Sequence, residues 1–199
     1  MEQYGWKGLT RTMPPSIIPY DRKAAVRYAH RWAHSRNPNF YDYEELGGDC
    51  TNFASQCLYA GTGIMNFTPT YGWYYIDANN KSPSWTGVPY FYNFITRGEE
   101  TAGPFGLETT LDNLEPGDFV QLRFNGEVFG HTPIIVAMGV PPTLENTLIA
   151  AHSYDADWRP LSTYFFQEIR FLHILGAYVP EGSDEQPSLS FRPNMSASS

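Results

Sequence analysis

The stretch Gly47-Gly48-Asp49-Cys50-Thr51-Asn52-Phe53 places a cysteine where a flexible loop turns into a helix. The Gly-Gly pair loosens the backbone, and Asp49 is of a residue type that is preferred at helix N-caps. The free N–H groups of a first helical turn, together with the positive end of the helix dipole, stabilise a thiolate. The stretch therefore predicts that Cys50 is a reactive thiol if a histidine can reach its sulfur.

A helix is expected over residues 50–59, ending at Gly61. Cys50 lies one turn before the apolar stripe of this helix, so its thiol should sit at the edge of the core, covered on one side only. Cys57 lies within the stripe and is expected to be a core residue. Two turns of one helix separate the two cysteines, about 10 Å along the axis, which excludes a disulfide between them.

The order of helical and strand patterns predicts an α+β fold. Another helix is expected over 21–35, and a short one over 90–95, within a stretch of loops and short elements at 62–113. After Pro116-Gly117-Asp118, apolar residues alternate with polar ones, and Asn125-Gly126 is a strong hairpin signal. Antiparallel strands are expected around residues 120–124, 131–138, 147–152 and 171–179.

The expected organisation is an irregular segment over 1–18, one domain over 19–180, and a disordered tail or linker over 181–199. The last of these has six serines among nineteen residues and little to bury. The first sixteen residues contain no apolar core of a secretory signal, and no apolar run is long enough to span a bilayer. A net charge of −8 without clustered Lys or Arg argues against nucleic-acid binding. The sequence thus predicts a soluble chain, with its cellular location left open.

A cysteine hydrolase needs an imidazole as base and a third polar group that orients it, and the chain has five histidines. His30 and His34 lie beside basic residues on the first helix and are expected on its solvated face. His173, in an apolar strand, is expected on the outer face or in the core. His131 opens one strand and His152 ends the next, so antiparallel pairing would bring these two imidazoles together.

These landmarks, in this order, resemble the bacterial putative amidase domain family of papain-like cysteine amidohydrolases, which is related to NlpC-like and CHAP peptidases. The resemblance extends from Tyr20 to about Leu161. It rests on Tyr20-Asp21-Arg22, Asn37-Pro38, Gly48 to Phe53, Trp73-Tyr74-Tyr75, Ser84-Trp85, His131, His152-Ser153-Tyr154-Asp155 and Arg159-Pro160-Leu161. It implies a papain-like or NlpC-like fold, with the nucleophile at a helix N-terminus packed on an antiparallel sheet.

The resemblance implies that Cys50 is the nucleophile and that His131 is the general base and acid. His152 takes the third position, with Asp155 as the alternative. The backbone N–H of Cys50 would hold the oxyanion, helped by a hydroxyl from Tyr41 or Tyr43, with Asp49 in support as a helix cap.

The family resemblance implies no metal and no other cofactor. The implied substrate is a peptide or amide, with a cell-wall stem peptide as one candidate. Pro133 departs from the family pattern and predicts an edge strand or a bulge beside His131. Trp73, Tyr74 and Trp85 are expected to form the groove walls, with core packing as the alternative interpretation.

Two other functions compete with catalysis. An inactive module could keep the fold and use its cleft to hold a peptide or a glycan. A zinc site could use Cys50, His131 and His152, because thiolate and imidazole both suit zinc, although no further ligand is evident.

Overall fold

The structure, a computed structural model, describes residues 15–180. Its helices are α1 (Arg22–Trp32), α2 (Cys50–Thr62), α3 (Pro83–Thr86) and α4 (Val88–Ile95), with 3₁₀ turns η1 (Glu44–Leu46), η2 (Leu111–Asn113) and η3 (Leu161–Thr163). The strands are β1 (Ile17–Ile18), β2 (Tyr75–Asp77), β3 (Asn80–Lys81), β4 (Gly103–Thr109), β5 (Phe119–Arg123), β6 (Ile134–Met138), β7 (Thr147–Ala151), β8 (Ala156–Pro160) and β9 (Glu168–Tyr178). The ends of the chain, 1–14 and 181–199, lie outside the described residues, and so do the expectations for them.

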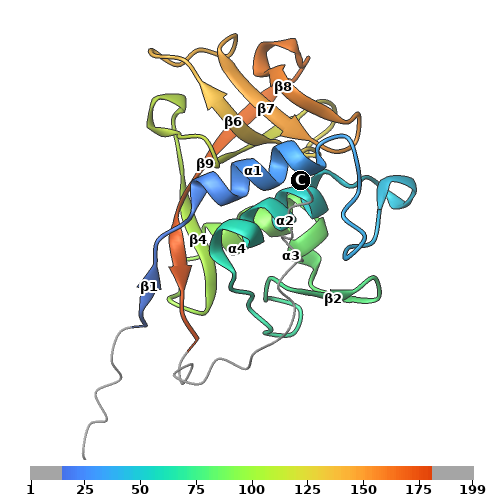
Figure 1. The fold of residues 1–199 in the computed structure, drawn as a ribbon, viewed down its shortest axis with the longest axis vertical. Helices are drawn as coiled ribbons and strands as arrows, with labels where there is room; N and C mark the ends of the chain where they lie inside the picture. Colours follow the sequence, from blue (N-terminus) through green and yellow to red (C-terminus); the bar gives the residue numbers. More distant parts are fainter. Residues whose placement is uncertain (1–14, 181–199) are drawn as a thin grey trace, which may run out of the picture.

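The larger sheet has seven antiparallel strands in the order β1-β9-β5-β6-β7-β8, and β4 also pairs with β9. Strand β9 is eleven residues long and runs from the region of β6–β8 to β1 and β4 (Figure 1). It therefore joins the part of the sheet that carries His131 to the part that packs on α4. The expected α+β fold, helices on an antiparallel sheet, is confirmed.

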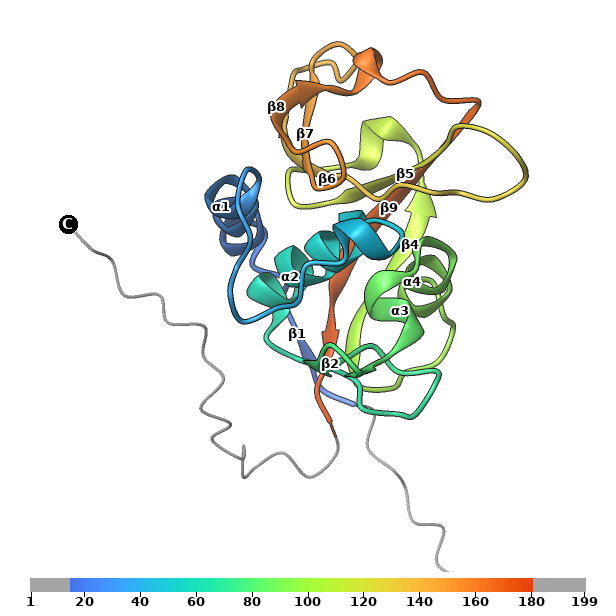
Figure 2. The same ribbon diagram turned by 90° about the vertical axis from the view of Figure 1, so that its right-hand side faces the viewer.

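Helix α2 lies in the middle of the molecule, with α1 on one side and α3 and α4 on the other (Figures 1 and 2). Ten of its thirteen residues are buried. Its polar side chains reach backbone or side-chain partners, as in the bonds from Ser55 Oγ to the Trp85 carbonyl (2.8 Å) and from Trp85 Nε1 to Asn52 Oδ1 (2.9 Å). A helix surrounded in this way holds its first residue, Cys50, in a fixed place.

The expected end of this helix at Gly61 is wrong, because α2 continues to Thr62 and ends at Gly63, with φ of 65°. Gly61 has another reason to be glycine. A Cβ there would lie 2.3 Å from the ring of Tyr20, so only glycine allows α2 to approach the start of α1 this closely.

Strands β4 and β8 are absent from the sequence-based expectations. Strand β4 contains two glycines and a proline, residues that strands usually avoid. Gly106 is required there, because a Cβ would lie 2.3 Å from the carbonyl oxygen of His173 on β9. Strand β8 contains Trp158 with φ of 56°, so its alternation is broken. Pairing with β9 and β7, rather than local preference, makes these segments strands.

Two apolar clusters lie on opposite sides of the sheet. One packs the helices onto it and includes Phe53, Trp85 and Phe119, and the other includes Leu122, Ile149 and Leu161. Between α1, β5 and β9 lies Asp118, which has no solvent exposure. Its carboxylate accepts hydrogen bonds from Arg22 Nη1 (2.6 Å), His173 Nδ1 (2.8 Å), and the backbone N–H groups of Ile174 (2.9 Å) and Glu115 (2.8 Å).

Replacing Asp118 by alanine should lower the free energy of unfolding by about 3–5 kcal/mol, because it leaves a guanidinium and two N–H groups without their buried partner. Urea denaturation measures this loss. Glu115→Ala is the matched control, since Glu115 contacts the same guanidinium at 3.1 Å but its side chain is 62% exposed. The control should lose less than about 1 kcal/mol. Equal losses in both variants would contradict a buried junction at Asp118.

Candidate active site

Cys50 is the first residue of α2, and only 7% of its surface is exposed. Its Sγ lies 3.8 Å from Thr51 Oγ1 and 3.9 Å from the carbonyl oxygen of Gly130. The backbone N–H of Thr132 also points to the sulfur and favours its ionised form. The sulfur therefore touches the backbone on both sides of His131.

Burial has the largest effect on the thiol, and it raises the pKa of Cys50 above its usual value. The backbone N–H groups of Thr132 and Thr51 and the Thr51 hydroxyl oppose this shift without reversing it. The first turn of α2 therefore favours the thiolate, as expected, but by less than burial disfavours it. Burial destabilises the thiolate by more free energy than the hydrogen bonds of the first helical turn stabilise it.

The imidazole of His131 is 5% exposed, and its Nε2 has no hydrogen-bond partner. Burial, followed by the positive charge of Arg159, lowers the pKa of His131 to about 4. His131 is thus neutral at pH 7. No hydrogen bond joins this imidazole to Cys50 Sγ among the contacts of residues 15–180.

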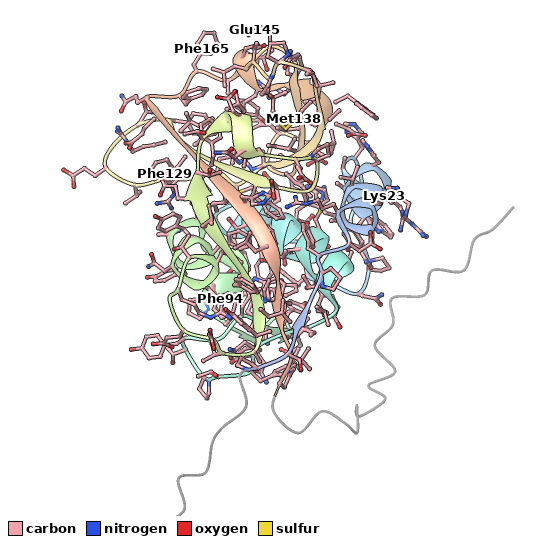
Figure 3. The ribbon with its side chains drawn as sticks, turned by 90° about the vertical axis from the view of Figure 1, so that its left-hand side faces the viewer. Lys23, Phe94, Phe129, Met138, Glu145 and Phe165 are labelled. Atoms are coloured by element: carbon pink, nitrogen blue, oxygen red, sulfur yellow. The ribbon has the colours of Figure 1, made fainter. Side chains whose placement is uncertain are left out.

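Pro133 affects the backbone that carries His131, as the sequence indicates. Strand β6 begins only at Ile134, and His131 pairs with Leu122 of β5 as an isolated bridge. Leu122 exchanges its two hydrogen bonds with two successive residues, accepting from the Gly130 N–H and donating to the His131 carbonyl, both at 3.0 Å. This irregular pairing lies in the connection between β5 and β6, which also carries Phe129 (Figure 3).

His152 lies on the other side of this strand pair, against α2. Its Nδ1 is 2.6 Å from Asp49 Oδ2, its Nε2 is 2.8 Å from the Trp32 carbonyl oxygen, and its ring stacks on Phe53 at 4.0 Å. Each ring nitrogen of His152 is thus engaged by an oxygen of α1 or of Asp49. With both nitrogens occupied, His152 has none free for His131.

The strand register explains this separation. Ile134 of β6 pairs with Ala150 of β7, so the register continues to place His152 opposite Thr132. Residues opposite one another point to the same face, and neighbours along a strand point to opposite faces. Accordingly, Thr132 Oγ1 meets Thr51 Oγ1 of α2 at 3.1 Å, while the His131 ring lies 6.0 Å from Phe124 and 5.5 Å from Tyr164.

Asp49 is at the N-cap position, yet its side chain makes no capping bond to α2, which corrects the expected role. Its Oδ1 accepts from the N–H of Tyr43 (2.9 Å) and from Asn52 Nδ2 (2.8 Å), while Oδ2 faces His152. The carboxylate is thus used to join β7 and the loop before Cys50. Asp155, the alternative third member, pairs with Arg36 at 2.8 Å, and within residues 15–180 it makes no hydrogen bond to His131 or His152.

The two tyrosines expected near the oxyanion differ in their availability. The hydroxyl of Tyr43 donates to the Ala78 carbonyl at 3.1 Å, and Tyr41 is 46% exposed. Sequence reasoning missed Tyr164, which lies beside His131 and follows η3 in a segment without a recognisable motif. Its hydroxyl oxygen is buried without a hydrogen-bond partner.

The expected groove walls need correction. Trp73 and Trp85 have no exposed surface, and their indole nitrogens bond to Ser55 and Asn52 of α2. These two side chains are core residues that anchor α2, so they cannot line an open groove. Tyr74 is half-buried and packs on Phe67, with ring centroids 5.5 Å apart.

Over residues 15–180, no three His, Cys, Asp or Glu side chains are grouped so that they could hold a metal ion. The zinc alternative therefore has no support in this part of the chain, where His152 is engaged by Asp49 and Trp32. In the same part, no helix has the length and apolar character needed to cross a membrane.

The geometry describes a buried thiol at a helix N-terminus, in contact with the backbone on both sides of a histidine whose imidazole is buried and neutral. The sequence model of the putative amidase domain matches residues 19–175, which include every residue of this site. The chain belongs to the putative amidase domain family.

Two similar proteins come from Bacillus subtilis (strain 168). The uncharacterized protein YhbB is 32% identical over 166 residues, covering 78% of this chain and 50% of YhbB. The uncharacterized protein YjcM is 28% identical over 133 residues, covering 61% of this chain and 29% of YjcM. The chain thus spans half the length, or less, of these relatives. No solved structure matches it.

The low pKa of His131 should make stability depend on pH. Its folded pKa of about 4 is below its ordinary value of 6.5, so the unfolded chain binds more protons between these values. The stability is complete above pH 6.5 and is lost as the pH falls toward 4. Relative to His131→Gln, which cannot titrate, the protein should lose about 2–3 kcal/mol between pH 7 and pH 4.5 in urea denaturation. Parallel pH profiles would contradict a buried neutral imidazole.

Proposed function

We propose that this protein is a cysteine-dependent hydrolase of amide or peptide bonds, with Cys50 as nucleophile and His131 as general base and acid. Membership of the amidase domain family supports hydrolysis of an amide. One observation supports these two residues in particular: Cys50 Sγ contacts the backbone on both sides of His131, whose Nε2 has no partner of its own. Cys57 has no exposure and offers no alternative nucleophile.

The resting pair in this proposal is a neutral thiol and a neutral imidazole. As the sulfur attacks a carbonyl carbon, His131 takes the thiol proton, and the imidazolium then returns it to the leaving amine. Water then hydrolyses the resulting thioester: His131 takes a proton from the attacking water and returns it to the sulfur of Cys50 as the acid product leaves. The N–H groups of the first turn of α2 face the charge that develops at the carbonyl oxygen.

His152 and Asp49 act in this proposal as positioning residues. Their buried pair fixes the start of α2 against β7, and so fixes the sulfur beside Gly130 and Thr132. Asp155 acts indirectly, because it pairs with Arg36, whose guanidinium lies 3.8 Å from the Asp49 carboxylate. Resemblance to papain-like, NlpC-like and CHAP enzymes supports Cys50 and His131 in their roles, and makes a cell-wall stem peptide the first natural substrate to test.

An inactive binding module is the second candidate, and one observation favours it. Cys50 and His131 are not hydrogen-bonded to each other, and burial favours the uncharged form of both. A domain of this kind would hold its ligand without cleaving it.

Hydrolysis of p-nitrophenyl acetate, a small activated ester, separates the two candidates. Catalysis predicts that Cys50→Ala abolishes the reaction, that His131→Gln slows it about 10²–10⁴-fold, and that Cys57→Ala, the matched control, keeps the rate of the unaltered protein. The rate at which iodoacetamide labels Cys50 should fall as the pH is lowered through about 4, where His131 gains its proton. In His131→Gln this pH dependence should be absent.

The binding-module hypothesis predicts another result. Labelling would then be slow at neutral pH, would rise only as the thiol itself ionises, and would be the same with or without His131. Ester hydrolysis would also be unchanged by Cys50→Ala.

A further inference from the structure

Two buried polar atoms on neighbouring rings, whose centroids are 5.5 Å apart, have no hydrogen-bond partner. They are Nε2 of His131 and the hydroxyl oxygen of Tyr164. Over residues 15–180, only one other side-chain atom is in this condition, Nε of Arg36, which lies 3.3 Å from an Asp42 carboxylate oxygen. Buried polar groups are almost always hydrogen-bonded, because an unmet one costs stability. Two such atoms lie within one group of rings formed by Phe124, His131 and Tyr164.

Tyr164 packs beside His131 and lies within the electrostatic range of Cys50. Its ring centroid is 5.5 Å from that of His131, and the charge of a Cys50 thiolate contributes to raising the pKa of Tyr164. The ring is fixed by packing on Phe124, with centroids 6.2 Å apart, and by the guanidinium of Arg159, 3.8 Å from the ring centroid. Arg159 is itself held by hydrogen bonds to Thr163, at 2.8 Å to the hydroxyl and 3.3 Å to the carbonyl oxygen.

The electrostatics of this group suit a hydrogen-bond donor. Burial raises the pKa of Tyr164, so its hydroxyl keeps its hydrogen at neutral pH. Arg159 acts in the opposite direction, through its charge and its approach to the hydroxyl, although no donor reaches the oxygen in hydrogen-bond geometry. A protonated hydroxyl that is backed by a fixed cation can stabilise an anion within its hydrogen-bonding reach.

We propose that Tyr164 is a catalytic residue whose hydroxyl donates a hydrogen bond to the oxyanion formed when Cys50 attacks a carbonyl. This inference rests on the proposed function. In the step, the sulfur forms a bond to the carbonyl carbon, the thiol proton moves to His131, and the carbonyl π electrons move to the oxygen. The hydroxyl of Tyr164 and the N-terminus of α2 hold that oxygen until the electrons return and the leaving group departs with the electron pair of its broken bond.

Tyr164 fits this role better than the tyrosines near the start of α2. The Tyr43 hydroxyl is already donated to Ala78, and Tyr41 is partly open to water, where a hydrogen bond gains less. The Tyr164 hydroxyl is buried, unpaired, and on the same side of the strand as His131.

Two probes of Cys50 test the proposal in the variant Tyr164→Phe, which removes only the hydroxyl. Acylation by p-nitrophenyl acetate passes through an oxyanion, and alkylation by iodoacetamide does not. The variant should acylate about 10²-fold more slowly, the usual effect of removing one oxyanion donor, while alkylation stays within about twofold. Tyr154→Phe is the matched control, because this hydroxyl belongs to a side chain that is 90% exposed, and both rates should be unchanged there.

Thermal unfolding distinguishes a catalytic hydroxyl from a structural one, because the two predict opposite changes in the unfolding temperature. Because the Tyr164 hydroxyl has no partner, Tyr164→Phe should unfold at the same temperature or a higher one. A hydroxyl that holds the fold together would lower it.

The outcomes are distinct. Equal slowing of acylation and alkylation would make Tyr164 a positioning residue for His131, and would overturn the oxyanion role. If acylation were slow in Tyr41→Phe and unchanged in Tyr164→Phe, the role would belong to Tyr41 and the proposal would be overturned. If Cys50→Ala hydrolysed the ester as fast as the unaltered protein, the nucleophile itself, and with it the proposed function, would be overturned.

Discussion

The carboxylate of Asp49 has no solvent exposure, and its partners come from distant parts of the chain. It contacts the imidazole of His152, which is 103 residues further along the chain, and accepts a hydrogen bond from the backbone N–H of Tyr43 in the loop before α2. Through His152, which also contacts the Trp32 carbonyl, it connects β7 to the end of α1. The position of Cys50, the next residue, follows from this junction.

Arg36 adds a second layer around the same junction. Its guanidinium faces Asp155 at 2.8 Å, Asp42 at 3.3 Å and Asp49 at 3.8 Å, so one cation lies among carboxylates from both sides of the site. Ser153 accepts a hydrogen bond from the Asp49 N–H (2.9 Å) and donates one to Glu44 (3.0 Å). Residues of the His152–Asp155 motif thus contact the loop that precedes Cys50 and fix its position. The motif therefore has a structural role in addition to any catalytic one.

Burial decides the charge state of the site. It raises the pKa of Cys50 and lowers that of His131, so each group loses its charge for the same physical reason. A site of this kind begins uncharged and acquires charge only as the substrate carbonyl is attacked. Unpaired atoms at His131 and Tyr164 are consistent with that order of events, since their partners would then arrive with the substrate.

Much of the architecture could be predicted from local pattern. The helix starting at Cys50, the helix that precedes it and the strands β5, β6, β7 and β9 follow from apolar periodicity and turn residues. Strand β4 could not, because its glycines and proline are tolerated only through pairing with β9, and neither could the buried setting of Trp73 and Trp85. Tyr164 carries no motif, and only the return of the chain after η3 brings it to His131.

The sequence by itself determined that a cysteine begins a buried helix, and that histidines flank two neighbouring strands of one antiparallel sheet. Only the tertiary structure decided which histidine lies on which side of the sheet. That decision depends on strand register, where one residue of offset reverses the face of every side chain. The register turns His152 toward α2 and Asp49, and leaves the His131 ring beside Tyr164.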